Sequence, residues 1–483
     1  MKPNEQVPGV SSPDEWWGEE DAFRNSIGTI QADGKRNWIT PRQPKGRYYN
    51  RRTWFSAVLL LLLFSGPFIH INGEPLFLFN ILKRKFILFG VIFWPQDFHL
   101  FVLAMITGIV AIVLFTVAFG RLWCGWACPQ TVFMEMVFRR IEYWIEGDGP
   151  AQRRLNKAPW NAEKIRKKVI KLSIFALFSF LIGNLVMAYV VGWEELSVII
   201  THSPAANWGV FTFVMIFSGI FYFVFAWFRE QACIAVCPYG RLQGAMLNKD
   251  SIVVAYDFVR GEPRGRRKKN DPKAEEKGDC IDCHMCVAVC PTGIDIRNGT
   301  QMECVNCTAC IDACDSIMDK VKKPRGLVRY ASHAGIEEGK SFHFSRKMMA
   351  YTAVLCVLMG ILTWGMTTRT QVETTLLRTS GILYQETDNG GVSNLYNIQL
   401  INKSKEPVTF SLKLTKPETG SIQTIGQSLL VPPQGIYKGS CIVEIPKTDL
   451  KGTKTPIRVE VWTEDRRLDV FNTNFLGPLV LPQ

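Results

Sequence analysis

Two cysteine-rich runs, CIDCHMCVAVCP at residues 280–291 and CVNCTACIDACD at residues 304–315, have the same spacing. In each run three cysteines are separated by two residues, and a fourth follows after three more. Three cysteines spaced in this way can hold one iron–sulfur cube, whereas the fourth, turned in the first run by Pro291, reaches across to the other cube. The runs therefore predict a bacterial-type ferredoxin domain with two [4Fe–4S] clusters.

Cross-ligation sorts the eight cysteines into two sets, each with three ligands from one run and the last ligand from the other. Quartet 1 is Cys280, Cys283, Cys286 and Cys314, and quartet 2 is Cys304, Cys307, Cys310 and Cys290. A zinc site would need only one such set, and the basic flanks argue against a disulfide framework. Asp315 stands where the first run has proline, which leaves the ligands intact but makes the second turn harder to predict.

The composition bounds the class of protein. The chain has 483 residues, a formal net charge of +13 and 14 cysteines. Basic residues flank long apolar segments, which is typical of the cytoplasmic side of membrane proteins, so we expect no nucleic-acid partner. The cysteines are too regularly patterned for a secreted disulfide scaffold, and outside the motifs only Cys356 and Cys441 remain. We expect Cys441 to be a buried small hydrophobic residue.

Five apolar segments have roughly the 18–25 residues needed to cross a membrane. They lie near residues 54–71, 99–119, 170–192, 208–228 and 348–366. The sequence thus predicts an α-helical bundle with five spanning helices. A further apolar piece, 76–94, is interrupted by Lys83, Arg84 and Lys85, so we expect it to be interfacial or re-entrant, with a sixth crossing as the alternative.

The distribution of basic residues predicts the orientation. Residues 120–169 contain ten Lys or Arg and residues 229–347 contain twenty, whereas 193–207 contain none. A cationic run that includes Arg51 and Arg52 precedes the first apolar segment. By the positive-inside rule, the N-terminus and the ferredoxin domain are expected in the cytoplasm, and five crossings place the C-terminus outside. No cleaved signal peptide is indicated.

The C-terminal part differs in character from the rest. Segments such as YNIQLINKS and VTFSLKLT alternate apolar and polar residues between turns, which favours a small β-sandwich. The expected domains are a cytoplasmic segment at 1–53, a four-helix membrane domain at 54–258, the ferredoxin domain at 259–347, a fifth spanning helix at 348–366 and the outer β-domain at 367–483.

Two further cysteine pairs follow apolar helices in similar contexts, FGRLWCGWACPQ at 119–130 and FREQACIAVCPYG at 228–240. Their members, called the paired cysteines below, are Cys124, Cys128, Cys233 and Cys237. A spacing of four directs both sulfurs of a pair to one side, and the repeat indicates an internal duplication. Four thiolates here would suit Cu(I) or another soft metal, a third cluster, or a cycling dithiol. Packing at helix ends is the structural alternative.

The whole pattern resembles the cytochrome c oxidase accessory protein family (CcoG/FixG/RdxA). The resemblance rests on FRNSIGTIQADGKRNWITPRQPKGRYYNRRTWF at 23–55, the paired CxxxCP motifs, the two-quartet domain and the outer β-domain. It implies a bacterial inner-membrane cupric reductase that converts Cu(II) into Cu(I) for assembly of a cbb3-type oxidase. It also implies an immunoglobulin-like outer domain, copper chaperones or oxidase assembly factors as partners, and a cytosolic electron donor that the sequence does not identify.

Two other functions remain open at this level. The membrane half is also similar to nitrate-reductase-type membrane ferredoxins, so the chain could connect a quinone to other redox partners without copper. Such a conduit would need a quinone pocket or outer haem ligands, for which His70, His99 and His202 are the candidates. The other alternative is a non-enzymatic scaffold for oxidase assembly, which retained assembly after cluster loss would favour.

Overall fold

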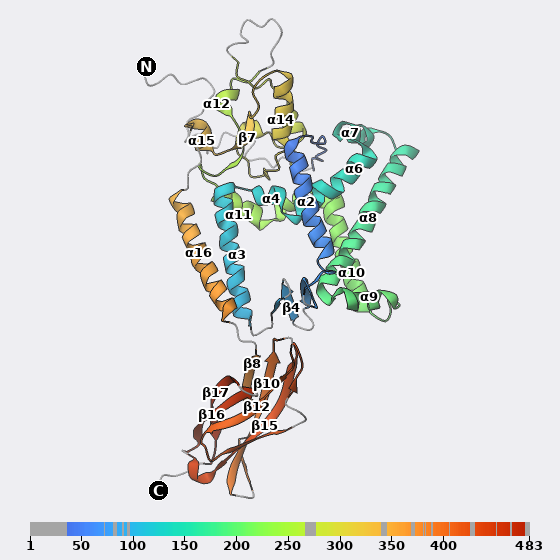
Figure 1. Cartoon of the computed structure of the whole chain (residues 1–483). Helices are drawn as coiled ribbons and strands as arrows, with labels where there is room; N and C mark the ends of the chain where they lie inside the picture. The colour runs from blue at the N-terminus through green and yellow to red at the C-terminus, as the bar shows by residue number, and fades with distance from the viewer. Residues whose placement is uncertain are drawn as a thin grey trace. The chain divides into compact units, whose positions relative to one another are not determined.

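The computed structural model describes residues 36–71, 73–80, 85–88, 91–93, 97–265, 277–339, 345–368, 372–379, 381, 383–387, 390–404, 406–425, 430–450, 452–463 and 466–478. The chain divides into two units, Met1–Leu362 and Thr363–Gln483, and each is described by itself. The first contains most of the helices and the cysteine motifs, and the second consists mainly of strands (Figure 1).

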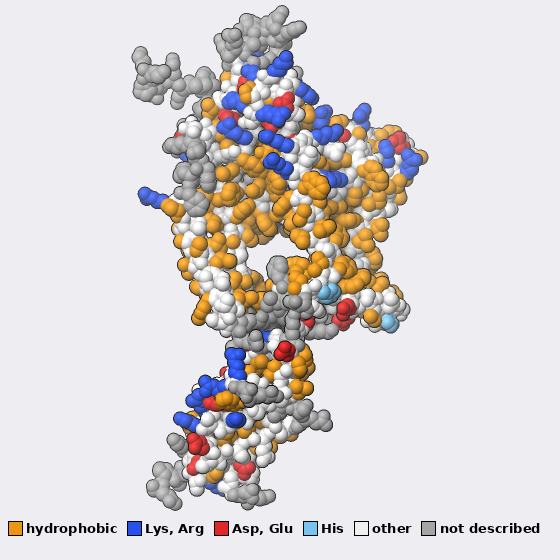
Figure 2. Space-filling model, viewed as in Figure 1, with side chains coloured by type: hydrophobic (Ala, Val, Ile, Leu, Met, Phe, Trp, Pro, Cys, Tyr) orange, Lys and Arg blue, Asp and Glu red, His pale blue; other side chains and the backbone are white. Residues whose placement is uncertain are grey.

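Four described helices are long and apolar enough to span a membrane. They are α3 (Phe98–Phe119), α8 (Ala162–Val191), α10 (Trp208–Phe223) with its π-helical extension η4 (Val224–Phe228), and α16 (Arg346–Thr367). Helix α8 begins earlier than its apolar core because the Asn161 side chain caps it by accepting the Lys164 N–H. In Figure 2 a broad hydrophobic surface covers the helices, and Lys and Arg gather at the end of the unit where α14 lies.

Five spanning helices were expected, whereas four described helices are long and apolar enough to span a membrane. The difference lies in the first segment, 54–71. Helix α2 (Arg47–Ser65) ends at Ser65 because Pro67 cannot continue it. Its uncharged part, from Trp54 onward, is roughly 18 Å long, which is short of the ~30 Å hydrocarbon core. Its ends nevertheless lie far apart: the N–H of Tyr49 binds Asp312 of α14, whereas the Leu63 carbonyl binds Tyr189 near the end of α8.

The apolar piece 76–94 forms strands where the structure describes it. Short strands β1 (His70–Ile71) and β2 (Glu74–Pro75) are followed by β3 (Phe77–Asn80), β4 (Lys85–Leu88) and β5 (Val91–Phe93). The last three make an antiparallel meander, with Phe77 opposite Leu88 and Phe86 opposite Phe93. The alternative of a sixth helical crossing is therefore wrong for the described residues.

Aromatic packing joins the membrane helices to the short helices that follow the first cysteine pair. Phe138 stacks on Phe225 with ring centroids 4.7 Å apart and meets Phe175 edge-on at 4.7 Å. Gly183 lets α8 approach α10, since a Cβ there would lie 2.2 Å from the Ser218 hydroxyl. The connecting elements are α4 (Leu122–Trp126), α5 (Pro129–Thr131), η3 (Val132–Phe138), α6 (Arg139–Glu146), α7 (Gly149–Lys157), α9 (Trp193–Thr201), η5 (Ala232–Val236) and α11 (Pro238–Met246).

The ferredoxin domain is closed by one pair of strands. Strand β6 (Val253–Tyr256) pairs antiparallel with β7 (Val328–Ala331), so the domain includes residues before the expected boundary at 259. Its helices are α12 (Phe258–Gly261), α13 (Met285–Ala288), η6 (Ile296–Asn298), α14 (Ala309–Lys320) and α15 (His333–Glu337). Buried apolar residues from β6, β7 and α14 surround the cysteine loops and shield them from water.

The second unit is the β-sandwich that the alternating pattern predicts. One sheet has the order β13-β15-β10-β8, with β9 on β10, and another has the order β12-β16-β17; β11 pairs with β14. The strands are β8 (Val372–Arg378), β9 (Gln385–Glu386), β10 (Gly391–Asn402), β11 (Val408–Thr409), β12 (Ser411–Lys416), β13 (Ser421–Ile425), β14 (Leu430–Val431), β15 (Ile436–Pro446), β16 (Lys454–Thr463) and β17 (Arg466–Leu476); a short 3₁₀ turn, η7 (Lys447–Asp449), follows β15. Cys441 is fully buried in the shared core, as expected for a small hydrophobic residue.

Candidate functional site

The two ferredoxin loops have the same backbone shape. Asp282 and His284 have φ angles of 53° and 54°, and the equivalent Asn306 and Thr308 have 52° and 66°. Non-glycine residues rarely adopt this left-handed conformation, so its repetition at matching positions shows that both loops wrap in the same way. Loops of this kind direct successive N–H groups inward and make a concave site for a negatively charged group.

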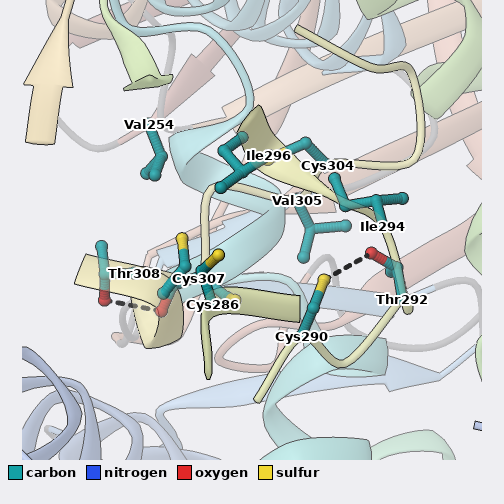
Figure 3. A pocket seen from close by; sticks show the side chains of 11 residues that line it. Val254, Cys286, Cys290, Thr292, Ile294, Ile296, Cys304, Val305, Cys307 and Thr308 are labelled. Carbon is teal, nitrogen blue, oxygen red and sulfur yellow. Dashed lines mark hydrogen bonds between the residues drawn. The ribbon is translucent and has the colours of Figure 1, made fainter. Parts of the chain in front are cut away.

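Each quartet lines its own cavity. All four cysteines of quartet 1 surround one cavity, together with His284 and Arg297. All four of quartet 2 surround another, together with Cys286 and apolar walls such as Val254 and Ile294 (Figure 3). Each cavity thus contains one predicted quartet, and Cys286 lines both cavities. Four thiols with largely apolar walls fit a [4Fe–4S] cube in each cavity.

The helix α14 supplies a ligand to each quartet. Cys310 lines the cavity of quartet 2 and Cys314 lines that of quartet 1. Because Asp315 replaces proline, α14 continues through Cys314 to Lys320. The Asp315 carboxylate accepts the Gly326 N–H at 3.0 Å and pairs with Arg47 at 3.4 Å, so the substitution ties the helix to neighbouring segments.

The turns that carry the paired cysteines are near copies of each other. Gly120 has φ 56° and ψ −135°, and Arg229, at the equivalent place, has φ 56° and ψ −124°. Cys128 and Cys237 both precede a helix that begins with proline, where the missing N–H costs no hydrogen bond. The sequence repeat therefore corresponds to a structural repeat.

The four paired cysteines interact with one another. Burial raises the pKa of the Cys233 thiol to about 12, and the other three thiols add to this rise. Burial also raises the pKa of Cys124, which the positive charge of Arg121 opposes. Residues 124 and 233 are far apart in sequence, so the fold brings both pairs to one place. Neutral thiols there would release protons on binding a soft metal.

A buried polar network holds Cys124. The Cys124 thiol donates to the side-chain carbonyl of Gln243 at 3.0 Å, and the same oxygen accepts the Arg121 Nε–H at 3.2 Å. Gln243 in turn donates to Thr116 at 3.3 Å. Gln243 is completely buried, so its hydrogen bonds within this network replace those that its side chain would otherwise make with water.

The first pair lies directly against quartet 2. A Cβ on Gly125 would be 2.3 Å from the Val305 carbonyl oxygen, so no side chain fits between helix α4 and the quartet-2 loop. Arg121 also donates to the Met302 carbonyl, two residues before Cys304. The turn that carries the first cysteine pair therefore packs directly against the loop of quartet 2.

No single-ion site is formed in the part of the chain that the structure describes: no three His, Cys, Asp or Glu side chains come close enough to hold one metal ion. Two of the candidate histidines form hydrogen bonds with nearby backbone: His70 with the Phe68 carbonyl and His202 with the Val198 carbonyl. His99 also has an interaction partner.

A buried ion network supports the second turn. Arg229 donates to both carboxylate oxygens of Glu142 at 2.8 Å. Although burial raises the pKa of Glu142, the charges of Arg229 and Lys171 outweigh this effect and lower it to about 2. Arg139 joins the network through Glu135 and Glu230, and it donates to the Pro291 carbonyl beside Cys290.

Sequence reasoning missed Arg121 and Gln243 and treated Arg52 only as part of a basic run. Arg121 had a usable signal, because a charged residue between an apolar helix and a cysteine pair calls for a functional or structural reason. Gln243 carries no such signal, since only the fold brings it to Cys124.

Comparisons with known protein families agree with this organisation. Residues 101–148 match the family described as 4Fe-4S binding domain, and residues 228–333 match the 4Fe-4S dicluster domain. Residues 362–478 match the family described as the IG-like fold at the C-terminal of FixG.

Three similar proteins share most of the chain. Protein RdxB of Cereibacter sphaeroides is 33% identical, over 89% of this chain and 94% of RdxB. Protein RdxA of the same organism is 38% identical, over 78% of this chain and 82% of RdxA. The nitrogen fixation protein FixG of Rhizobium meliloti is 32% identical, over 82% of each chain.

Proposed function

The chain belongs to the family of FixG, RdxA and RdxB, and on that premise we propose that it is a cupric reductase, passing single electrons from its ferredoxin domain to Cu(II) at the paired cysteines. Its broader character, a membrane iron–sulfur electron-transfer protein, follows from the family and the apolar helices. When bound, the [4Fe–4S] clusters supply and accept single electrons.

The observation that carries the proposal is the contact between helix α4 and quartet 2. Gly125 abuts the Val305 carbonyl, which leaves the buried Cys124 next to the loop that holds Cys304. Cysteine thiolates favour Cu(I) over Cu(II), so a one-electron donor at this place converts an incoming Cu(II) into the form the thiols retain. The chain's residues thus bind the ion, exclude water and release the thiol protons.

The proposal includes an orientation in a bacterial inner membrane. The basic end of the first unit, with the N-terminus and the ferredoxin domain, faces the cytoplasm, where a soluble one-electron donor supplies the clusters. Because α2 runs from Asp312 toward Tyr189, it can serve as a short first crossing. Together with the four longer helices it places the β-sandwich in the periplasm. Copper chaperones or assembly factors of a cbb3-type oxidase would then receive Cu(I).

The test is an anaerobic single-turnover experiment on the detergent-solubilised protein. The clusters are reduced, excess reductant is removed, and stoichiometric Cu(II) is added while cluster reoxidation and Cu(I) formation are followed together. One Cu(I) should form for each electron lost by the clusters. A variant with Ser at all four paired cysteines should keep its ferredoxin iron but lose fast Cu(I) formation.

Cys356→Ser is the matched control, because Cys356 is exposed on α16 and belongs to neither set of motifs. It should behave like the unmodified protein. Reduced clusters that ignore copper but reduce a quinone analogue would establish the conduit instead. Clusters indifferent to both, with normal oxidase assembly after cluster loss, would favour the scaffold.

A further inference from the structure

Three arginines are buried around quartet 2. Arg52, Arg121 and Arg139 are 3%, 5% and 1% exposed. They come from α2, from the turn after α3 and from α6, so only the folded chain brings their charges together. A buried guanidinium without a carboxylate partner is costly, which makes its position informative.

Arg52 is a buried arginine of α2 with an unpaired nitrogen. Its Nη2 is buried and has no hydrogen-bond acceptor within the described chain. Three residues before Arg52, the Tyr49 N–H of α2 binds Asp312 of α14, the helix that carries the quartet-2 ligand Cys310. Arg52 therefore brings a positive charge, with an N–H donor that no described residue accepts, to the helix bound to α14.

Arg121 is buried with neutral partners. It donates to the Gln243 side chain and to the Met302 carbonyl. No carboxylate lies within ion-pair distance of Arg121 or Arg52 in the ranges that the structure covers. Arg139 differs, since Glu135 at 3.0 Å and Glu230 at 3.6 Å balance its charge. Among the described residues, Arg52 and Arg121 thus lack an ion-pair partner, whereas Glu135 is paired with Arg139, and Glu303 precedes Cys304.

Quartet 1 has the opposite surroundings. Its buried arginine, Arg297, is bound by Asp295 at 2.6 Å and by Asp282. A third carboxylate, Asp315, follows the ligand Cys314 directly and pairs with the half-exposed Arg47 at 3.4 Å. Water reaches quartet 1 at the exposed Cys283 and also stabilises charge there, but the other quartet-1 thiols are buried or half-buried. At the buried Arg297, two carboxylates thus outnumber one guanidinium, whereas Arg52 and Arg121 have no carboxylate partner among the described residues.

The effect of these charges on a bound cluster has a defined sign. Reduction adds one negative charge, which nearby cations stabilise and nearby carboxylates destabilise, and net charge and hydrogen bonds to sulfur set cluster potentials. The cluster beside Arg52 and Arg121 should accordingly have the higher reduction potential. Quartet 1, whose Cys283 is exposed, is the more accessible to a soluble donor.

We propose that Arg52 and Arg121 make the cluster of quartet 2 the electron acceptor of the cluster of quartet 1, so that electrons enter at quartet 1 and leave at quartet 2. One electron leaves the first cluster and reduces the second, and a soluble one-electron carrier restores the first. This deepens the proposed function, on which its direction toward the paired cysteines rests. Arg52 and Arg121 are positioning residues, acting through charge.

The test is an EPR-monitored potentiometric titration of the full protein without copper. The unmodified protein should show two one-electron waves. Arg52→Gln or Arg121→Gln should lower the equilibrium constant for reduction of the higher-potential cluster at least tenfold, which lowers its midpoint potential by about 59 mV for one electron. The midpoint potential of the lower wave should stay nearly unchanged. Arg52→Lys and Arg121→Lys keep the positive charge, so the midpoint potential of their upper wave should stay close to that of the unmodified protein. Arg325→Gln, on an exposed surface, should move neither wave.

Asp295→Asn tests the assignment from the other side and does not depend on the arginine variants retaining their clusters. It removes a carboxylate at quartet 1 and should raise the lower wave. The proposal is overturned if Asp295→Asn raises the midpoint potential of the upper wave. It is also overturned if an arginine-to-glutamine variant that keeps its full iron content shifts the lower wave, or shifts neither of the two waves. Because no copper is present, failure of cupric reduction would leave these results unaffected.

Discussion

Arg229 is a residue whose backbone and side chain depend on each other. Its φ of 56° is unusual for a residue with a Cβ and costs about 1–3 kcal/mol. The bidentate pair with Glu142 offsets this strain and holds the second cysteine turn in the shape that Gly120 gives the first. Gly120 in the first cysteine turn and Arg229, held by Glu142, in the second thus adopt the same backbone conformation.

Removing the carboxylate should therefore destabilise the first unit. Glu142→Gln leaves the buried Arg229 without its partner, and we expect a loss of about 3–5 kcal/mol. Thermal unfolding of the solubilised protein would measure it. Glu163→Gln, which breaks the exposed pair with Lys167, should have no measurable effect. Equal stability of the two variants would contradict this role for Glu142.

The same pair predicts a dependence on acid. The pKa of Glu142 is lowered to about 2, below the usual carboxyl value, so its contribution is present above the unfolded pKa of about 4.5 and disappears as the pH falls through about 2. Unfolding followed between pH 6 and pH 2 should show this loss in the unmodified protein. The loss attributable to this group should be absent in Glu142→Gln, which no longer titrates there.

Gly125 offers a direct test of the contact between the two sites. Gly125→Ala places a Cβ 2.3 Å from the Val305 carbonyl oxygen, so helix α4 must move away. We expect slower electron transfer from reduced clusters to copper, with nearly unchanged cluster potentials, in stopped-flow and potentiometric measurements. Gly108→Ala in α3, where a Cβ meets nothing, is the control. An unchanged rate in Gly125→Ala would contradict transfer through this contact.

At the level of elements, α2 is held by a cap from another helix. The backbone N–H groups of Tyr48 and Tyr49 donate to the Asp312 carboxylate of α14, at 3.1 and 2.7 Å. Gly46 makes room for this carboxylate, since a Cβ there would lie 2.3 Å from Asp312 Cγ. A carboxylate at a helix N-terminus binds unsatisfied N–H groups and interacts favourably with the helix dipole.

Asp312→Ala should therefore loosen α2. We expect a loss of about 1–2 kcal/mol, the usual cost of removing an N-cap. Faster hydrogen exchange confined to the first turns of α2 would locate the change. Asp319→Ala, on the exposed end of the same helix, is the control, and similar exchange in both variants would exclude the cap.

Prediction from sequence succeeded where one pattern governs one element. The spacing of the cysteines predicted the ferredoxin loops, and alternation predicted strands β10 and β12. It was less successful at 54–71 because hydropathy continues past Ser65, whereas Pro67 ends the helix. The meander at 77–93 was missed because short apolar runs do not distinguish strands from other membrane-associated segments.

At the scale of the whole chain, the two units should respond differently to iron. Metal binding contributes to folding only where the ligands lie, and the ferredoxin ligands belong to the first unit. Iron removal by a chelator should lower the unfolding temperature of the first unit and leave the β-sandwich unchanged. Calorimetry with hydrogen exchange can separate the two, and a joint shift would contradict independent units.

The charged contacts of the site could not be predicted from the sequence. Arg52, Arg121 and Arg139 are separated by up to 87 residues, and only packing of α2, the α3 turn and α6 brings them to quartet 2. Periodicity and motifs describe neighbours along the chain, whereas these contacts depend on distant elements. For the same reason, the hydrogen bond between Cys124 and Gln243 could not be predicted from the sequence.

Helix α14 also ties cofactor loading to biogenesis. Within five residues it presents Cys310 to one quartet, Cys314 to the other, and Asp312 to the start of α2. A newly made chain without iron lacks the ligation that fixes α14, so its earliest apolar helix is expected to remain poorly docked. Iron starvation would then expose α2 to membrane proteases, which pulse-labelling of iron-depleted cells can detect. Delivery of inorganic iron would thereby govern the lifetime of the whole polypeptide.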